Sequence, residues 1–386
     1  MRGTASIPGI LLAALACGDA APRDAIVRAD SAGLAVVTNR APDRLLDWRF
    51  ERILDLGGDA EGVEAFHRVH GTSVGTDAAG NLYVLDAGAF RVTVFDAQGR
   101  VVRGFGGRGR GPGEFGFPSD LAVNDEGSTA VYDFARRGFV RFAGDGSALP
   151  EVSVRGALQR KLALGGGRLF GVFQFARSEA DTLLLTELLS IGAADTVALA
   201  RINSPTPRDV SFSCMGLSIP PFLAPSIVWA AQGERVVIAA TPAYALEVHD
   251  AGRKAGLWRR DLPLIPATVA LAAAEVASDS FRMLSAAGRC AVSAREAAER
   301  IGYAEVVPYV KDLVVARNGE VWVLRRTAEP AVARIDLFSP RGEYLGTFPP
   351  GTPFPAAFRA ANEVVTVETD SLDLPHVIVY RVLRDD

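Results

Sequence analysis

The fold is decided by residues 80–100, GNLYVLDAGAFRVTVFDAQGR. Two runs rich in β-branched, aromatic and aliphatic side chains, 82–86 and 91–95, flank a short turn, and a glycine turn follows at 98–100. Such runs indicate β-strands, and the short turns between them indicate antiparallel pairing. The stretch therefore predicts one unit of an antiparallel sheet.

The same unit recurs along the chain. It returns at 127–146 (GSTAVYDFARRGFVRFAGDG) and at 318–343, and weaker copies lie near 162–185, 227–248 and 363–380. Repeats of about 40–50 residues built from short strands are typical of β-propellers, in which each repeat forms one blade. Six units predict one all-β ring, a six-bladed β-propeller, where a length of 386 residues alone would suggest two or three domains.

A closed ring needs a strand from the other end of the chain, because an unpaired edge invites aggregation. The run 34–38, LAVVT, is predicted to complete the sixth blade. Residues 267–303 break the strand pattern with apolar positions at helical spacing, and 293–296 (SARE) fit a capping box. We predict a short insertion of two helices between blades four and five, either a cap over one face of the ring or a lateral decoration.

The first residues have the pattern of an export signal. Arg2 precedes the apolar run 7–16, IPGILLAALA, and Cys17 follows; a charged start, an apolar core and small residues mark secretory signals. The sequence ALAC at 14–17 resembles the lipobox of bacterial lipoproteins, in which the cysteine is acylated, although Leu15 stands two positions before the cysteine where the large aliphatic residue usually stands three before it. A plain signal peptide is the alternative.

These patterns divide the chain into a signal peptide (1–16), a tether (17–24) and a propeller (25–386, with the helical insertion at 267–303). We expect a monomer exported to the cell envelope, in the periplasm or at the outer membrane, and lipid-anchored at Cys17. Because apolar runs stay short of the ~18 residues of a membrane span, membrane contact is expected through the anchor alone. A formal charge of −4 gives no field that would attract nucleic acid.

Export bears on the two remaining cysteines, Cys214 and Cys290. Two thiols in an oxidising compartment are more often paired than free, and neither has the CxxC or histidine neighbour that metal or redox chemistry needs. We predict a Cys214–Cys290 disulfide, which would join the long connection 203–225 to the helical insertion.

The repeats also resemble a known family. The stretch 118–123 (PSDLAV) and its continuation look like NHL-type repeats, and 106–115 (GGRGRGPGEF) is similar to the linker of bacterial six-bladed β-propeller lipoproteins. That family is mostly of unknown function. The resemblance implies a propeller fold and an envelope location, and it implies no particular reaction.

Candidate site residues follow from the geometry of a propeller, whose innermost strands line an axial channel. Counting back from the hairpin glycines places five residues at equivalent positions where these strands begin: Ser73, Asp120, Lys161, Ser226 and Asp312. Asp86 and Asp133 end the second strands on the same face. Carboxylates at a channel mouth could hold Ca²⁺ or a cationic group. The alternative is that the aspartates stabilise turns by accepting backbone N–H bonds.

Spacing alone assigns no catalytic residue and no transition-metal site. The four histidines lack the spacing of metal ligands. No cofactor is expected apart from Ca²⁺ in the axial channel. The sequence favours a module that binds a ligand or an envelope protein; the alternatives are a metal-dependent, lactonase-like hydrolase or lyase that uses the channel, and a structural scaffold.

Overall fold

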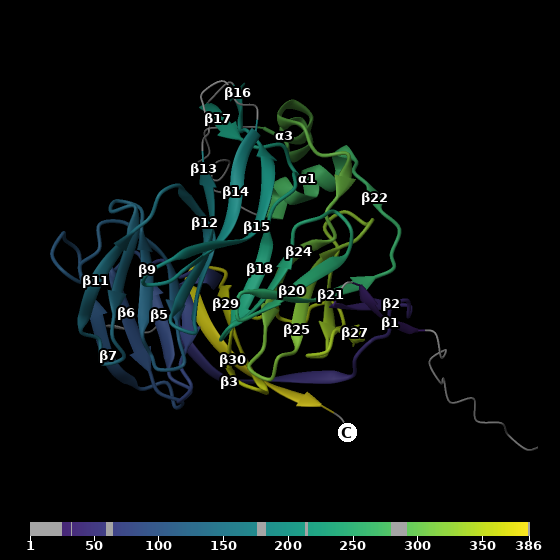
Figure 1. The fold of residues 1–386 in the computed structure, drawn as a ribbon. Coiled ribbons are helices and arrows are strands. Elements are labelled where there is room, and N and C mark those ends of the chain that lie inside the picture. The colour runs from purple at the N-terminus through teal and green to yellow at the C-terminus, as the bar shows by residue number, and fades with distance from the viewer. Residues whose placement is uncertain are drawn as a thin grey trace, which may run out of the picture.

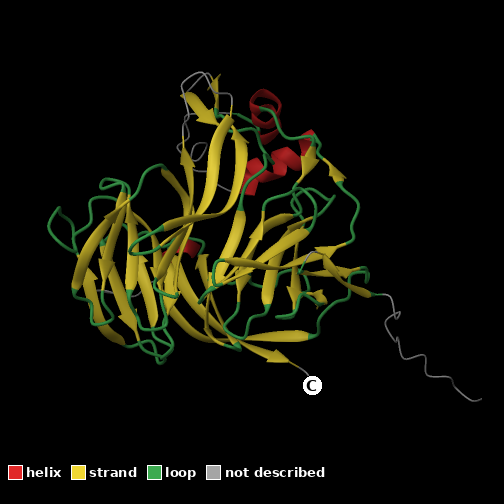
Figure 2. Cartoon of the chain, in the orientation of Figure 1, coloured by secondary structure: helices red, strands yellow, loops and turns green. Residues whose placement is uncertain are grey.

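The structure is a computed structural model that describes residues 25–31, 33–58, 65–175, 183–212, 215–278 and 292–384. Most of its strands form six sheets, the blades, which are arranged in a ring (Figures 1 and 2). The first strand of each blade lies nearest the axis, and the following strands step outward. The predicted six-bladed β-propeller is confirmed.

The first three blades follow one another along the chain. Blade one contains β4 (Val74–Thr76), β5 (Leu82–Asp86), β6 (Arg91–Phe95) and β7 (Val101–Gly106). Blade two contains β8 (Pro118–Val123), β9 (Thr129–Asp133), β10 (Gly138–Phe142) and β11 (Ala148–Ser153). Blade three contains β12 (Ala157–Gly165), β13 (Arg168–Phe175), β14 (Leu183–Ile191) and β15 (Thr196–Pro205).

The other three blades include the two ends of the described chain. Blade four contains β18 (Val228–Gln232), β19 (Arg235–Ala239), β20 (Ala245–Asp250) and β21 (Arg253–Arg260). Blade five contains β24 (Val310–Val315), β25 (Val321–Arg326), β26 (Ala333–Phe338) and β27 (Tyr344–Thr347). Blade six contains β28 (Ala357–Ala360), β29 (Glu363–Thr369), β30 (Pro375–Arg384) and the N-terminal strand β3 (Trp48–Gly57).

The second strand of a blade shows why the repeats are so visible in the sequence. All five residues of β5 and all five of β9 are buried, because neighbouring blades cover both faces of the strand, so the strand must be almost continuously apolar. Each turn before such a strand needs a positive φ, which Gly80 (81°), Gly127 (77°) and Gly319 (83°) supply.

The ring is closed by β3, and the prediction that residues 34–38 close it is wrong. β3 pairs with β30 along its whole length, from Trp48 opposite Arg384 to Gly57 opposite His376. Both strands have ten residues. The Trp48 and Phe50 rings also pack edge-on against Trp322 of blade five, at 6.3 and 6.2 Å between centroids.

The run predicted to close the ring belongs to blade four instead. β2 (Leu34–Asn39) pairs in parallel with β21, from Ala35 opposite Gly256 to Asn39 opposite Arg260, and β1 (Ile26–Ser31) pairs antiparallel with β2. These two strands make blade four a six-stranded sheet. Six residues could not have covered the ten-residue edge of β30, which is the physical reason for the difference.

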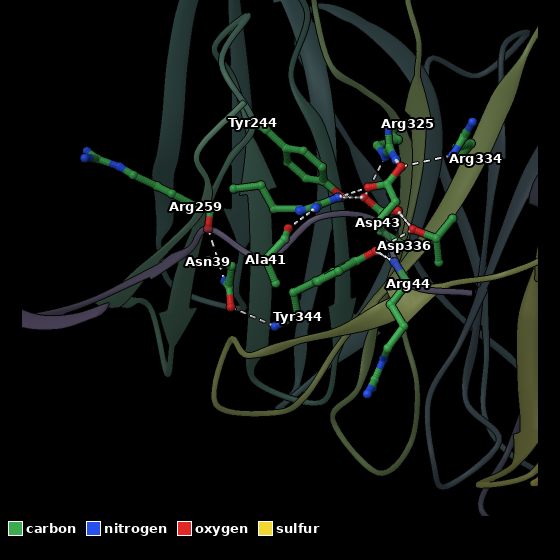
Figure 3. Close-up of polar contacts among 12 residues, drawn as sticks. Asn39, Ala41, Asp43, Arg44, Tyr244, Arg259, Arg325, Arg334, Asp336 and Tyr344 are labelled. Atoms are coloured by element: carbon green, nitrogen blue, oxygen red, sulfur yellow. Dashed lines mark hydrogen bonds and ion pairs between the residues drawn. The ribbon is translucent and has the colours of Figure 1, made fainter. Parts of the chain in front are cut away.

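Between β2 and β3 the chain crosses the outer edge of blade five as an N-terminal strap, residues 40–47. The Leu46 N–H donates to the Thr347 carbonyl oxygen at 2.9 Å, and the Thr347 N–H donates to that of Arg44 at 2.7 Å. Just before the strap, the buried Asn39 amide donates to the Gly342 carbonyl oxygen at 2.9 Å. It also donates to the Arg259 carbonyl oxygen at 3.1 Å and accepts the Tyr344 N–H at 2.9 Å (Figure 3). The segment 26–57 therefore joins blades four, five and six from outside.

The strap completes a buried charge cluster between blades four and five (Figure 3). Asp336 is fully buried and accepts hydrogen bonds from Arg325 Nε (2.7 Å), Arg260 Nη1 (3.2 Å), Tyr244 Oη (2.9 Å) and Thr347 Oγ1 (2.6 Å). Both arginines are buried, so one carboxylate does not balance them.

Asp43 of the strap supplies the second carboxylate of this cluster. It accepts from Arg260 Nη1 at 2.8 Å, from Arg334 Nη1 at 3.0 Å and from Arg325. Burial alone would raise the pKa of Asp43, but the hydrogen bond from Arg260 and the charges of Arg325 and Arg260 outweigh it and lower the pKa. The strap is therefore fixed to the ring by charge as well as by its backbone.

The closing seam contains a histidine–aspartate ion pair whose contribution to stability depends on pH. His376 Nδ1 of β30 lies 2.9 Å from Asp55 Oδ1 of β3, and this hydrogen bond raises the pKa of His376 above 6.5. The stabilisation is therefore complete below about pH 6.5 and is lost as the pH rises through the raised pKa. We expect the melting temperature to fall by about 1–3 °C between pH 6 and 8 from this pair.

Scanning calorimetry of the wild type and of His376→Gln measures this effect, since the substitution should remove that part of the pH dependence. His67→Gln is the matched control, because the His67 side chain is largely exposed and its partner, Asp86, lies in blade one. Equal pH slopes in the wild type and His376→Gln would contradict the prediction.

The predicted helical insertion between blades four and five is confirmed. It contains α1 (Val269–Ser278) and α3 (Ala294–Ile301). Ser293 caps α3, its hydroxyl accepting the Glu296 N–H at 3.1 Å, as the sequence indicates. The short strands β22 (Ile265–Pro266) and β23 (Val306–Val307) pair at its base.

A second insertion follows blade three and contains the hairpin of β16 (Arg208–Phe212) and β17 (Met215–Ile219). Both insertions lie on the side of the ring where the innermost strands begin, which we call the upper face and which is at the top of Figure 1. The residues of the predicted lipid anchor and disulfide, Cys17, Cys214 and Cys290, lie outside the described residues, as do the predicted signal peptide and tether.

Candidate functional site

The structure brings four of the seven predicted site residues together at the upper mouth of the axial channel. Lys161 of blade three donates through Nζ to Asp312 Oδ1 at 2.8 Å and to the Leu313 carbonyl oxygen at 2.7 Å. The Lys161 N–H donates to Asp120 Oδ1 at 3.1 Å. Ser73 is buried beside them, with its hydroxyl 3.4 Å from the Ser119 carbonyl oxygen.

Lys161 spans the channel mouth because of a local distortion in β12. The register between β12 and β13 shifts between Gln159 and Leu162, and Lys161 has a φ of 82°, which is rare for a residue with a side chain. Blade four lies between blades three and five in the ring, so the lysine must cross the axial space to reach Asp312. Backbone strain of this kind concentrates at functional positions.

At the channel mouth, where the sequence predicts a bound cation, the Lys161 ammonium pairs with the Asp312 carboxylate. A hollow of about 250 Å³ at the mouth is lined by Lys161 and Asp312, together with His70, Thr72 and Phe354. Within the described ranges, no three His, Cys, Asp or Glu residues are grouped as metal ligands would be. Calcium binding in the channel stays a prediction, and the described residues contain no group of carboxylates that would hold the ion.

Asp86 and Asp133 are occupied by their own turns. The Asp86 carboxylate accepts backbone N–H bonds from His67 (2.8 Å), Arg68 (3.0 Å) and Gly88 (2.8 Å). Asp133 does the same for Gly116 (2.6 Å) and its neighbours. Burial would raise the pKa of Asp86, but the bonds from His67, Ala89 and Arg68 outweigh it and lower the pKa. Both aspartates therefore have the geometry of the alternative in which they stabilise turns. Ligand binding by the two residues stays a prediction.

The lower end of the channel is crossed by Arg317, from the first hairpin of blade five. Its guanidinium donates to the carbonyl oxygens of Asp77 (2.7 Å), Thr76 (3.2 Å) and Phe358 (3.1 Å), and to the carboxylate of Asp125 (2.7 Å). One side chain therefore joins blades one, two, five and six. Lys161 and Arg317 both line the channel cavity of about 180 Å³.

The larger pocket of the upper face lies where the two insertions meet. The Phe222 N–H donates to the Gly302 carbonyl oxygen, and the Ala304 N–H donates to that of Phe222, both at 2.9 Å. Together with blade three the insertions enclose a pocket of about 420 Å³, which we call the insertion pocket. The two segments that the predicted disulfide would join are thus in contact through their backbones.

Helix α1 forms part of the rim of this pocket. Leu271, Ala272 and Val276 are buried in the core that blades four and five share. Glu275 accepts from Arg326 Nε at 2.8 Å and lies 3.6 Å from Lys311 Nζ. Burial would raise the pKa of Glu275, but Arg326 and Lys311 outweigh it and lower the pKa.

Ser226 is the one predicted site residue that lines the insertion pocket, and it lies exposed at its rim. The other polar residues of the pocket escaped the sequence reasoning: Gln159, Gln174, Thr186, Ser204, Glu275 and Arg326. A signal for four of them exists, because polar side chains gather on one face of blade three near the upper ends of its strands, at Gln159, Gln174, Thr186 and Ser204. These positions can be recognised as pocket residues only when the position of the insertions is known.

The fold and these sites define a six-bladed β-propeller with a walled pocket on its upper face. Residues 75–154 match the sequence model of a family described as a 6-bladed beta-propeller, which confirms the resemblance expected from the repeats. A comparison with curated proteins gave no match. Across the described residues, every helix is too short or too polar to cross a membrane.

Three solved structures illustrate the similarity. A Bacteroides fragilis protein described as exported is 12% identical, with a TM-score of 0.49 over 91% of this chain and 99% of its own. A DUF4221 member from Bacteroides vulgatus is 8% identical, with a TM-score of 0.47 over 89% and 100%. Virginiamycin B lyase from Staphylococcus aureus is 8% identical, with a TM-score of 0.37 over 86% and 98%. Identities of this size indicate no ligand or reaction for this chain.

Proposed function

We propose that this protein is a ligand-binding propeller of the cell envelope and that the insertion pocket is its binding site. The observation that carries the proposal is that the two segments that interrupt the repeat fold onto each other and enclose about 420 Å³. Loops held on a rigid scaffold commonly carry function, and ligand sites are typically concave pockets of about 300–1,000 Å³.

The envelope location rests on the sequence. The proposed export and acylation at Cys17 would place the ring outside the cytoplasm, on a tether of a few residues. There, a monomeric propeller would meet small solutes without a membrane-spanning segment.

A reaction in the axial channel has less support. The channel mouth holds Lys161 paired with Asp312, and the lower end holds Arg317 bonded to three carbonyl oxygens and Asp125. These charges and polar groups are already paired within the ring. The geometry therefore favours binding at the insertion pocket over metal-dependent hydrolysis or lyase chemistry in the channel.

A thermal-shift screen tests the proposal on the chain from residue 25, which lacks the proposed signal peptide and tether. The probes are neutral and charged metabolites: sugars, nucleosides, amino acids and dipeptides. A ligand present at 100 times its Kd should stabilise the protein by about 2.7 kcal/mol, a shift of several degrees.

Ser226→Trp should fill the pocket from its exposed rim and abolish the shift. Ser153→Trp on the outer strand of blade two is the matched control, since this serine is also exposed and lies in another blade. A shift that persists in Ser226→Trp would place the binding site elsewhere.

A further inference from the structure

A row of uncharged polar side chains crosses all four strands of blade three at the insertion pocket. Gln174 of β13 stands opposite Ala157 of β12 on one side and opposite Thr186 of β14 on the other. Gln159 lies two residues from Ala157, so it shares this face of the sheet. Thr186 and Ser204 of β15 are joined by a hydrogen bond of 2.9 Å between their hydroxyls. All four residues line the pocket.

The row begins where packing between blades ends. Further along the same face of blade three, Phe170, Val172 and Leu188 pack against Trp229 and Ile238 of blade four. Past Val172 the face becomes mixed: Gln174 and Thr186 follow, beside the apolar Ile202 and Leu184, and the insertions contribute to its surroundings. A face needed only for packing would stay apolar, because burying hydroxyls and amides costs free energy unless they are hydrogen-bonded.

Two of the four side chains keep hydrogen-bonding capacity for a ligand. Thr186 and Ser204 are 3% and 6% exposed and satisfy each other in part. The Gln159 amide makes one long bond of 3.4 Å to the Ala157 carbonyl oxygen. For the Gln174 amide, no bond to another described residue is found. An amide both donates and accepts, so these groups suit a ligand that does the same.

The charges of the pocket cancel. Glu275 and Arg326 are paired at 2.8 Å, and Arg326 also donates to the carbonyl oxygens of Pro308 (3.2 Å) and Val310 (3.1 Å). A phosphate or carboxylate would need a cation whose bonds are not already committed, and a cationic ligand would need such a carboxylate. The pocket therefore favours a neutral ligand.

Another part of the pocket lining is apolar. It is formed by the connection 219–227, which contributes Pro220, Pro221, Phe222 and Leu223. Neutral sugar rings have the matching character, with hydroxyls that donate and accept along their edges and C–H groups on their faces. We propose that the insertion pocket binds a neutral saccharide of one or two rings, an inference that rests on the pocket being the binding site proposed above.

Isothermal titration calorimetry with maltose, cellobiose, lactose and N,N′-diacetylchitobiose tests this assignment, with glucuronic acid, a nucleoside and a dipeptide as other ligand classes. At least one neutral saccharide should bind to the wild type. Gln174→Leu and Gln159→Leu should each weaken that binding about tenfold, since each removes the hydrogen bonds of one amide. Gln159 is exposed, so its variant should fold. Gln98→Leu, an exposed glutamine in a turn of blade one, should leave the affinity unchanged.

The outcomes separate the two proposals. Binding of a charged sugar, a nucleoside or a dipeptide that Ser226→Trp abolishes would overturn the saccharide assignment and leave the binding site intact. Saccharide binding that survives Gln174→Leu, Gln159→Leu and Ser226→Trp would overturn both. Absence of any binding across the panel would also overturn the saccharide assignment.

Discussion

Replacing Asp336 by alanine should lower the free energy of unfolding by about 3–5 kcal/mol, because it leaves buried charges without their partner. Arg260 and Arg325 are 4% and 6% exposed, and both donate to this carboxylate. Asp43 would then be the remaining carboxylate of the cluster, facing three arginines. Urea denaturation followed by tryptophan fluorescence would show the loss as a lower midpoint with an unchanged slope.

Asp250→Ala is the matched control for this prediction. Asp250 also pairs with an arginine, accepting from Arg235 Nε at 2.8 Å and Nη2 at 3.1 Å, but its side chain is 45% exposed. Water replaces the lost partner there, so the change should stay within about 1 kcal/mol. Similar losses in the two variants would contradict the assignment of the Asp336 effect to burial.

Removal of the closing strand should have the largest effect of all. A chain that begins at residue 58 lacks β3 and leaves the ten-residue edge of β30 unpaired. It also removes Trp48 and Phe50 from the aromatic contacts with Trp322 and Phe348. We expect loss of the whole stability of about 5–15 kcal/mol and aggregation through the open edge. Circular dichroism during heating would then show no cooperative transition.

Two longer chains are the controls for this truncation. A chain that begins at residue 25 retains β1, β2, the strap and β3 and should melt cooperatively. A chain that begins at residue 40 loses β1 and β2 but keeps the strap and β3, so it should fold with a lower melting temperature. Cooperative melting of the chain from residue 58 at the temperature of the chain from residue 25 would contradict the role of β3.

The ring could be predicted from the sequence because its most buried strands have the strongest pattern. β5, β9 and β25 lie between neighbouring blades and read as apolar runs after glycine turns. The closing strand could not be predicted in the same way. β3 lies at an outer edge, so Arg49, Glu51 and Arg52 interrupt its apolar pattern, and the run 34–38 reads as a better strand than β3 does.

The channel mouth was predictable because equivalent positions in a repeat converge on one axis. Asp120, Lys161 and Asp312 meet there as expected, but the lysine pairs with a carboxylate where a cation was predicted. The insertion pocket was not predictable from equivalence, because insertions have no counterpart in other blades. Gln174 and Thr186 are recognisable as pocket residues only because the structure places them on one strand face and in one pocket with residues of the connection 219–227.

The N-terminal strap gives the ring a defined response to mechanical load. A pulling force that reaches residue 26 from the N-terminal side acts first on β1 and β2, which lie on the outer edge of blade four. It then meets the strap, where Asp43 is held by Arg260, Arg325 and Arg334. Only after both have detached does tension reach β3 and the seam that closes the ring. The segment 26–47 therefore protects the pairing of β3 with β30 from the first part of any extension of the N-terminus.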